Sequence, residues 1–493
     1  MTVEDLAELH ERATELHVVV VGGGAAGLVA AREAAKVGMR VTVVESADQV
    51  GGAIRTGEVA GLTLDLGAES FATRGGHVAS LIRELGLDDD IVAPNSAGAW
   101  VAGVPSVGAA PLPKGGVLGI PASPFDEDVR RVIGWRGAWR AYVDRVRPPM
   151  TIGHADSLGV LVRSRMGARV LDRLVAPVTS GVYSAAPDDI DPDVAAPGLN
   201  TALTRTGSLS GAVAELAEKR ATAPGGAVKG LRGGMGSLVR ALAADIETRG
   251  GELLLGTTVA AIERAPDDAD HAWRVVLDAA ADDGESAALD AHAVIVATEE
   301  RPARALLAPV VGSALEADPP VAGPVVSIAT LVVDAPELDA APRGTGVLTV
   351  PGSHRAKALT HASAKWAWVA ETAGAGTHVV RVSFGSVDAP PATDALGSDD
   401  QIALALEEAS ALLGVSLDAA HVRGARVERF QQSQPAATKG HRQQTAAARS
   451  AIRSVAEIGA VGAWLSGTGL AQVVPDAIDE ADRLRRALLF AQQ

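Results

Sequence analysis

The sequence predicts an α/β protein with more than one domain, and three observations favour this fold class. The chain has 493 residues, 47% of them hydrophobic, so it is long enough to bury several cores. Its opening "HVVVVGGGAAGLVAAREAAKVGMRVTVVES" (17–46) reads as strand, glycine-rich turn, helix and strand, the order of a parallel βαβ unit. Two later β-branched runs predict strands of a second, mostly antiparallel sheet, at 325–334 and 378–385.

Charge and hydropathy exclude several function classes. The chain has 44 Lys plus Arg against 60 Asp plus Glu, a formal charge of −16, which disfavours nucleic acid as a partner. The first 17 residues are acidic where a signal peptide is cationic and then apolar, so we expect a short solvated helix there. No window reaches the roughly 18 consecutive apolar residues of a membrane span. We therefore expect a cytoplasmic protein with at most peripheral membrane contact.

The glycines after the first strand have the spacing G-x-G-x-x-G. Gly22 permits a tight turn, Gly24 lets the backbone approach a pyrophosphate at the helix N-terminus, and Gly27 lets the helix pack on the strand. Glu45 ends the second strand 18 residues after Gly27, where a ribose-binding carboxylate belongs. The pattern predicts dinucleotide binding. The alternative is a tight turn without a ligand.

A second glycine-rich segment follows, with the doublet Gly51-Gly52, Arg55 and "LDLGAES" (64–70). It resembles the extended signature of FAD enzymes in the amine oxidase, phytoene desaturase and protoporphyrinogen oxidase superfamily. The resemblance implies FAD as cofactor, held by a discontinuous Rossmann-like domain of the GR2 (p-hydroxybenzoate hydroxylase-like) type. It places these residues at the cofactor: Gly22, Gly23, Gly24, Ala25, Ala26, Gly27, Glu45, Ser46, Gly52, Ala53, Gly67, Ala68, Glu69, Ser70, Val259, Phe430, Val473 and Val474.

The same features indicate how the flavin is reoxidised. No second strand followed by G-x-G-x-x-G appears, so we expect no separate nicotinamide domain. The sequence has no Cys, which rules out a dithiol relay. The reduced flavin must then pass its electrons to oxygen or to another diffusing acceptor, as in an oxidase. The histidines lack the spacing of metal ligands, so we expect no metal.

Four further segments resemble the bacterial porphyrinogen oxidases: 111–124, 156–199, 344–352 and 427–443. With the FAD segments, the likeness extends from about His17 to Leu489. It implies that Gly181, in "APVTSGVYSA", offers its backbone carbonyl to the pyrrole N–H groups of the substrate, and that Arg74 binds a propionate. The alternatives are a glycine required by a turn and a solvated surface arginine. Because the flavin performs the difficult step, we predict no catalytic side chain.

The resemblance also implies how the chain is divided. The FAD-binding domain comprises 15–95, 228–310 and 440–493, the substrate domain 96–114 and 311–439, the helical domain 115–200, and a mobile polar connection 201–227. In the helical domain, Trp135 and Trp139 lie four residues apart among arginines. Either they pack in the core beneath a solvated arginine face, or they dock on a membrane surface or on another haem-pathway enzyme.

One segment departs from the family pattern. Gln472, Val473 and Val474 stand where the family has small residues in a turn beside the flavin, although Pro475 and Asp476 are kept. The expected position of Val473 and Val474 at the cofactor therefore brings more side-chain bulk near the flavin than in the family.

The function expected from the resemblance is oxidation of coproporphyrinogen III to coproporphyrin III by O2 in haem biosynthesis, in three two-electron steps that yield H2O2. The acidic chain resembles the soluble bacterial branch that acts on this tetracarboxylate. Three alternatives stay open. They are oxidation of protoporphyrinogen IX, another flavin amine oxidase or desaturase activity, and a non-catalytic binding protein on the same fold. The aromatic content of 3% disfavours an amine oxidase, which needs an aromatic cage beside the flavin.

Overall fold

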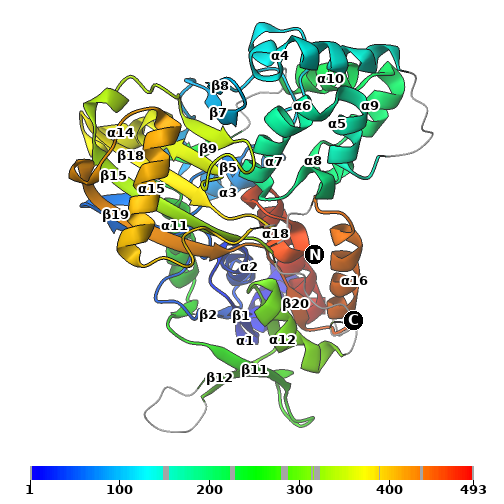
Figure 1. The fold of residues 1–493 in the computed structure, drawn as a ribbon. Helices are drawn as coiled ribbons and strands as arrows, with labels where there is room; N and C mark the ends of the chain where they lie inside the picture. Colours follow the sequence, from blue (N-terminus) through cyan, green and yellow to red (C-terminus); the bar gives the residue numbers. More distant parts are fainter. Residues whose placement is uncertain are drawn as a thin grey trace.

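The structure is a computed structural model that describes residues 3–147, 155–221, 228–278, 287–312, 315, 323–387, 389–433 and 437–490. It contains a parallel sheet between layers of other elements, a second large sheet, and a group of helices beside the second sheet (Figure 1). The predicted α/β class is confirmed. The acidic start of the chain forms helix α1 (Val3–Glu15), as the sequence predicts.

The parallel sheet has five strands in the order β10-β2-β1-β14-β20. All four pairings are parallel, and β1 at the centre pairs with β2 on one side and β14 on the other. The strands come from distant parts of the chain: β1 (His17–Val21), β2 (Arg40–Val44), β10 (Glu252–Leu254), β14 (Ala293–Val296) and β20 (Ile458–Ala460). Their valines and isoleucines are buried on both faces, as expected of a covered parallel sheet.

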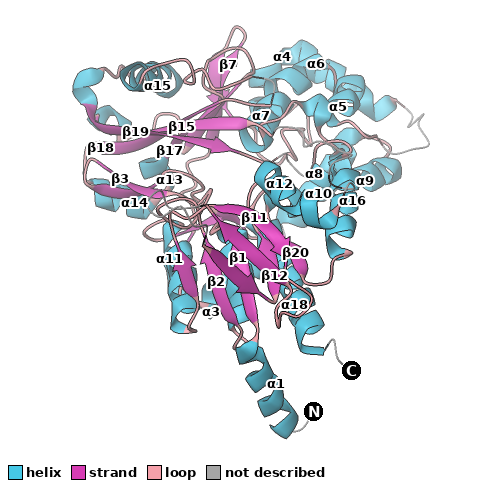
Figure 2. Ribbon diagram, turned by 90° about the horizontal axis from the view of Figure 1, so that it is seen from below, coloured by secondary structure: helices cyan, strands magenta, loops and turns pink. Residues whose placement is uncertain are grey.

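Both faces of this sheet are covered (Figure 2). Val18 and Val20 face a core shared with α2 (Ala25–Ala35), α11 (Gly236–Thr248) and α18 (Leu470–Phe490). Val19 and Val21 face a second core with elements on the opposite side, β11 (Val259–Arg264), β12 (Trp273–Leu277), β13 (Ala288–Ala291), α12 (Glu300–Val311) and α16 (His441–Arg453). Alternate residues of β1 thus enter different cores, which gives the three-layer arrangement.

The second large sheet has seven strands in the order β19-β15-β18-β17-β16-β7-β8. Only the β16–β7 pairing is parallel, so the sheet is mixed and mostly antiparallel, as predicted. Its strands are β7 (Ala99–Val104), β8 (Gly108–Pro111), β15 (Val325–Asp334), β16 (Gly346–Thr349), β17 (Ala358–His361), β18 (Thr377–Phe384) and β19 (Val422–Gln431). Leu331 packs toward helix α15 (Ser398–Leu413), and Val332 packs toward α14 (Ala367–Ala373) on the other face.

The helical part shares one core. Its helices are α4 (Glu127–Tyr142), α5 (Leu158–Met166), α6 (Ala168–Val170), α7 (Ala176–Tyr183), α8 (Pro192–Ala195), α9 (Leu199–Thr206) and α10 (Leu209–Ala221). The prediction of an irregular connection at 201–227 is wrong for residues 201–221, because Leu199, Leu209 and Val213 are buried and hold α9 and α10 in this core. Residues 222–227 lie outside the described residues.

Helix α4 is bent, and its tryptophans are on the surface. Gly134 has φ 69°, so the helical backbone is interrupted there. Trp135 is 60% exposed and Trp139 is 59% exposed, so the expectation that they pack in the core is wrong. The guanidinium of Arg130 lies 4.4 Å from the centroid of the Trp135 ring. Among the described residues, no helix combines the length and the apolar character needed to cross a bilayer.

Candidate functional site

The predicted nucleotide turn joins β1 to α2, and two of its glycines are required by the fold itself. Gly22 has φ +109°, a conformation that favours glycine, and a Cβ on it would lie 2.9 Å from the carbonyl carbon of Ala297. A Cβ on Gly27 would lie 1.9 Å from the carbonyl oxygen of Gly22. Gly27 therefore allows α2 to start directly against the turn.

Gly24 has no such internal reason. It caps the N-terminus of α2 with φ −71°, which any residue can adopt, and an added Cβ would meet nothing within 4 Å. In the part of the chain that the structure describes, the N–H groups of Ala25 and Ala26 have no backbone acceptor. Open space beside unpaired N–H groups at a helix N-terminus fits an anionic group such as a diphosphate.

The glycine doublet closes this space from the other side. The Gly51 N–H donates to the Gly23 carbonyl at 2.8 Å, and Gly51 has φ +124°. Gly52 has φ +58°, and a Cβ on it would lie 3.3 Å from the Gly24 Cα. Two backbones without side chains thus face each other. We call the space between Gly24, Gly52 and the N-terminus of α2 the glycine cradle.

Glu45 lies beside the cradle at the end of β2. Its Oε2 accepts the Gly23 N–H at 2.7 Å, and its Oε1 accepts the Ala47 N–H at 2.9 Å and the Ser46 hydroxyl at 3.3 Å. The Thr257 N–H donates to the Glu45 carbonyl at 2.9 Å, which brings Val259 and the start of β11 to the same edge. The structure therefore gathers Glu45, Ser46 and Val259, as the sequence predicts.

The "LDLGAES" segment continues from the doublet. The Ala68 N–H donates to the Ala53 carbonyl at 2.8 Å, and a Cβ on Gly67 would lie 2.1 Å from that oxygen. Gly67 therefore permits close packing of two backbone segments that both come from predicted cofactor residues. Ser70 follows, half-buried, before strand β5 (Phe71–Ala72).

The side chain of Glu69 is engaged by the second sheet. Lys365 lies 2.6 Å from its Oε1, and Arg381 of β18 lies 2.8 Å from its Oε2. Arg381 also donates to the Gly67 carbonyl. Burial opposes ionisation of Glu69, but the charges of Arg381 and Lys365 outweigh it and lower its pKa to about 2. Because both carboxylate oxygens have cationic partners, a direct contact between this side chain and a cofactor is less favourable than the sequence suggests.

Asp65, at the start of the same segment, caps helix α11. Its carboxylate accepts the N–H groups of Met235 at 2.9 Å and Gly236 at 3.4 Å. Burial raises the pKa of Asp65 to about 6, although these hydrogen bonds act in the opposite direction. Asp65 and Glu69 together fix the segment to α11 on one side and to the second sheet on the other.

The predicted substrate residues lie on different elements. Gly181 is in the last turn of α7, and no described N–H group donates to its carbonyl oxygen. A Cβ on Gly181 would lie 2.5 Å from Leu348 Cδ2, at the end of a flexible side chain. Arg74 is exposed in the turn before α3 (His77–Glu84). Phe430 is half-buried near the end of β19, opposite Val326.

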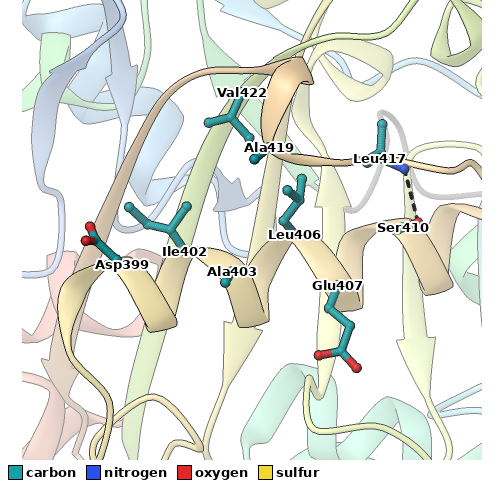
Figure 3. Close-up of a pocket in the computed structure, with 9 residues that line it drawn as sticks. All are labelled: Asp399, Ile402, Ala403, Leu406, Glu407, Ser410, Leu417, Ala419 and Val422. Atoms are coloured by element: carbon teal, nitrogen blue, oxygen red, sulfur yellow. Dashed lines mark hydrogen bonds between the residues drawn. The ribbon is translucent and has the colours of Figure 1, made fainter.

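A groove of about 720 Å³ lies elsewhere, between α15 and the segment 417–422 that leads into β19. Figure 3 shows its apolar lining, including Ile402, Leu406 and Val422. None of the residues that the sequence predicts for cofactor or substrate contributes to it. Among the described residues there is also no cluster of three or more His, Asp or Glu that could hold a metal ion.

Residues 25–484 match the family model described as flavin containing amine oxidoreductase. The chain belongs to this flavin-containing family. The family confirms the predicted flavin, FAD, and the protein is an FAD-dependent oxidoreductase.

Relatives of this flavoenzyme extend over nearly its full length. It is 28% identical to "Coproporphyrinogen III oxidase" of Propionibacterium freudenreichii subsp. freudenreichii, over 97% of this chain and 92% of the relative. It is 30% identical to the protein of the same name from Mycobacterium tuberculosis H37Rv, over 96% and 97%. Its fold is similar to a structure from Exiguobacterium sp. 255-15, provisionally named a protoporphyrinogen oxidase, with TM-score 0.78, 22% identity, and 97% and 99% coverage.

The glycine cradle fits the FAD of this family, and the C-terminal turn of the flavoenzyme differs from the prediction. Helix α18 begins at Leu470, so the N–H of Val473 is already donated to the Gly469 carbonyl at 3.1 Å, and Val474 is fully buried. Within the described chain, the N–H groups of Leu470 and Ala471 have no backbone acceptor. If the flavin edge meets α18, these two groups are better placed to donate than Val473 and Val474.

Sequence reasoning missed Lys365 and Arg381. They lie 296 and 312 residues from Glu69, so no local pattern joins them to it. One signal was available: Arg381 stands inside the strand "THVVRVSF", whose neighbours are apolar. A charge in a buried strand needs an opposite charge nearby, so this arginine indicates a buried acidic partner.

Glu69 makes the stability of this flavoenzyme depend on pH. Its pKa is about 2 in the folded state and 4.5 ordinarily. Because the folded-state pKa is depressed, the ion pairs stabilise the fold fully above about pH 4.5 and lose this contribution as the pH falls toward 2. We expect Glu69→Gln to reduce the acid-dependent loss of unfolding free energy by on the order of 3 kcal/mol in this window. Urea unfolding at several acidic pH values measures it, with the exposed Glu58→Gln as control. Parallel profiles for wild type and Glu69→Gln would contradict the prediction.

Proposed function

We propose that the protein oxidises coproporphyrinogen III to coproporphyrin III and that O2 is the electron acceptor. The observation that carries the proposal is the likeness, over 92–97% of their length, to relatives named for this reaction. The position of Gly181 supports it as well. Its unpaired carbonyl at the end of α7 is an acceptor suited to the pyrrole N–H groups at the centre of the macrocycle.

The residues of the chain bind and orient in this proposal. The glycine cradle holds the diphosphate of FAD, Glu45 binds the ribose, and Val259 lies near the adenine. When bound, the flavin supplies a two-electron acceptor for a C–H bond of the substrate. Val182, next to Gly181, is 66% exposed and offers apolar surface to the ring. The domain boundaries and the roles of Arg74 and Phe430 stay predictions, as does a cytoplasmic location.

Oxygen consumption tests the function. A porphyrinogen carries six more electrons than its porphyrin, so a two-electron flavin must turn over three times and consume three O2 for each porphyrin formed. We expect this ratio, with matching H2O2, when coproporphyrinogen III is the substrate, and a slower reaction with protoporphyrinogen IX. An oxygen electrode and porphyrin fluorescence measure both quantities. Faster turnover of protoporphyrinogen IX would favour the second candidate, which the name of the Exiguobacterium structure suggests. No turnover of either compound would overturn the proposal.

A further inference from the structure

Lys357 lies between β16 and β17, close to the end of α7. Its ammonium donates to the Ser184 hydroxyl at 2.6 Å, and Ser184 is the residue that ends α7, with φ 54°. In the described part of the chain, no carboxylate lies within 4.0 Å of this ammonium. An ammonium has three N–H donors, and Ser184 is its one hydrogen-bond partner among the described residues.

Such a cation is costly to keep in this place. Burial lowers the pKa of Lys357 to about 8, and no neighbouring acid offsets the effect. The contrast with Lys365 is direct, because Lys365 is paired with Glu69 at 2.6 Å. A half-buried ammonium without a counter-ion is the arrangement expected where an anionic group arrives from outside.

The surroundings of Lys357 are apolar and accessible. Val182 of α7 is 66% exposed, and Val387 is 40% exposed. The Val387 N–H donates to the Ser184 carbonyl at 2.9 Å, so both valines belong to the structure around Ser184. The Ser184 hydroxyl also lies 3.4 Å from Gln432 Oε1, which fixes its position. Exposed valines beside one unpaired cation suit a ligand that is apolar but carries a carboxylate.

We propose that the Lys357 ammonium binds a propionate carboxylate of the substrate and that Ser184 orients it. The inference rests on the function proposed above and deepens it by naming a specificity residue. Gly181 lies three residues before Ser184 on α7, so one short segment would hold both the centre and one arm of the macrocycle. A structural alternative is that Lys357 only caps the carbonyl end of α7.

Two ligands separate these roles. Coproporphyrin III carries free carboxylates, whereas its tetramethyl ester has the same ring without the charges. We expect Lys357→Met, which keeps the length of the side chain, to weaken binding of coproporphyrin III about 10- to 100-fold, the range for loss of a charge-assisted hydrogen bond. Binding of the ester should change less than about twofold. Porphyrin fluorescence titration of the FAD-loaded protein measures both dissociation constants.

The controls distinguish the possible failures. Lys357→Arg should recover most of the affinity, and the exposed Lys114→Met, which removes the same charge, should behave like wild type. In turnover, Lys357→Met should raise KM for coproporphyrinogen III with little change in kcat. Equal weakening of acid and ester would assign Lys357 to capping α7 and overturn the inference, as would an unchanged KM in an active enzyme. An inactive wild type would overturn the proposed function, and this inference with it.

Discussion

Replacing Gly24 with valine is expected to yield a folded protein that carries less than about one-tenth of the wild-type flavin. A Cβ at this position meets no protein atom within 4 Å, and the backbone conformation is open to any residue, so the fold has no reason to fail. The added methyl groups would instead fill the glycine cradle, where Gly52 and the N-terminus of α2 leave room for a diphosphate. The ratio of flavin to protein absorbance after purification measures the loss, and circular dichroism measures the fold.

The chain offers a matched control for this substitution. Gly397 also caps a helix, with φ −70° against −71° for Gly24, and a Cβ on it also meets nothing within 4 Å. Gly397→Val should keep both fold and flavin. Gly27→Val should instead disturb the fold, because its Cβ would overlap the Gly22 carbonyl oxygen. Full flavin content in Gly24→Val would show that the diphosphate does not lie in the glycine cradle.

Replacing Arg381 with methionine is expected to lower the free energy of unfolding by about 3–5 kcal/mol. The change leaves the Glu69 carboxylate buried with Lys365 as its remaining cationic partner, and it removes the side-chain donor to the Gly67 carbonyl. The cost is therefore that of an incompletely compensated buried charge, and not only of one lost contact. Urea unfolding at neutral pH, with a second probe to check two-state behaviour, provides the value.

Two further variants test this explanation. Arg426 stands opposite Thr330 on one side of β15, as Arg381 does on the other, but it is exposed and pairs with Glu428 at 2.6 Å. Arg426→Met should cost less than about 1 kcal/mol, the usual range of a surface pair. Adding Glu69→Gln to Arg381→Met should recover part of the stability, since the buried charge is removed. If the double variant is less stable than Arg381→Met by the full cost of each change, the buried charge is not the cause.

The nucleotide turn could be predicted from the sequence because every part of it is local. Glycine spacing, two valine-rich strands and Glu45 lie within 29 residues, and the structure places them as expected. The roles of Glu69 and Val473 could not be predicted in the same way. Glu69 is engaged by residues about 300 positions away, and Val473 depends on where α18 begins. Trp135 and Trp139 were placed wrongly, because the amphipathic pattern does not reveal which face a neighbour covers.

The order of strands in the parallel sheet has a consequence for biosynthesis. The central strand β1 is among the first residues to leave the ribosome, yet β20 joins the sheet only at Ile458, and α18 then packs over α2. Contacts of such long sequence separation form late, since the chain loop between them must first be closed. Loading with FAD therefore follows completion of translation, and until then the exposed apolar side of α2 depends on chaperones or rapid synthesis for protection.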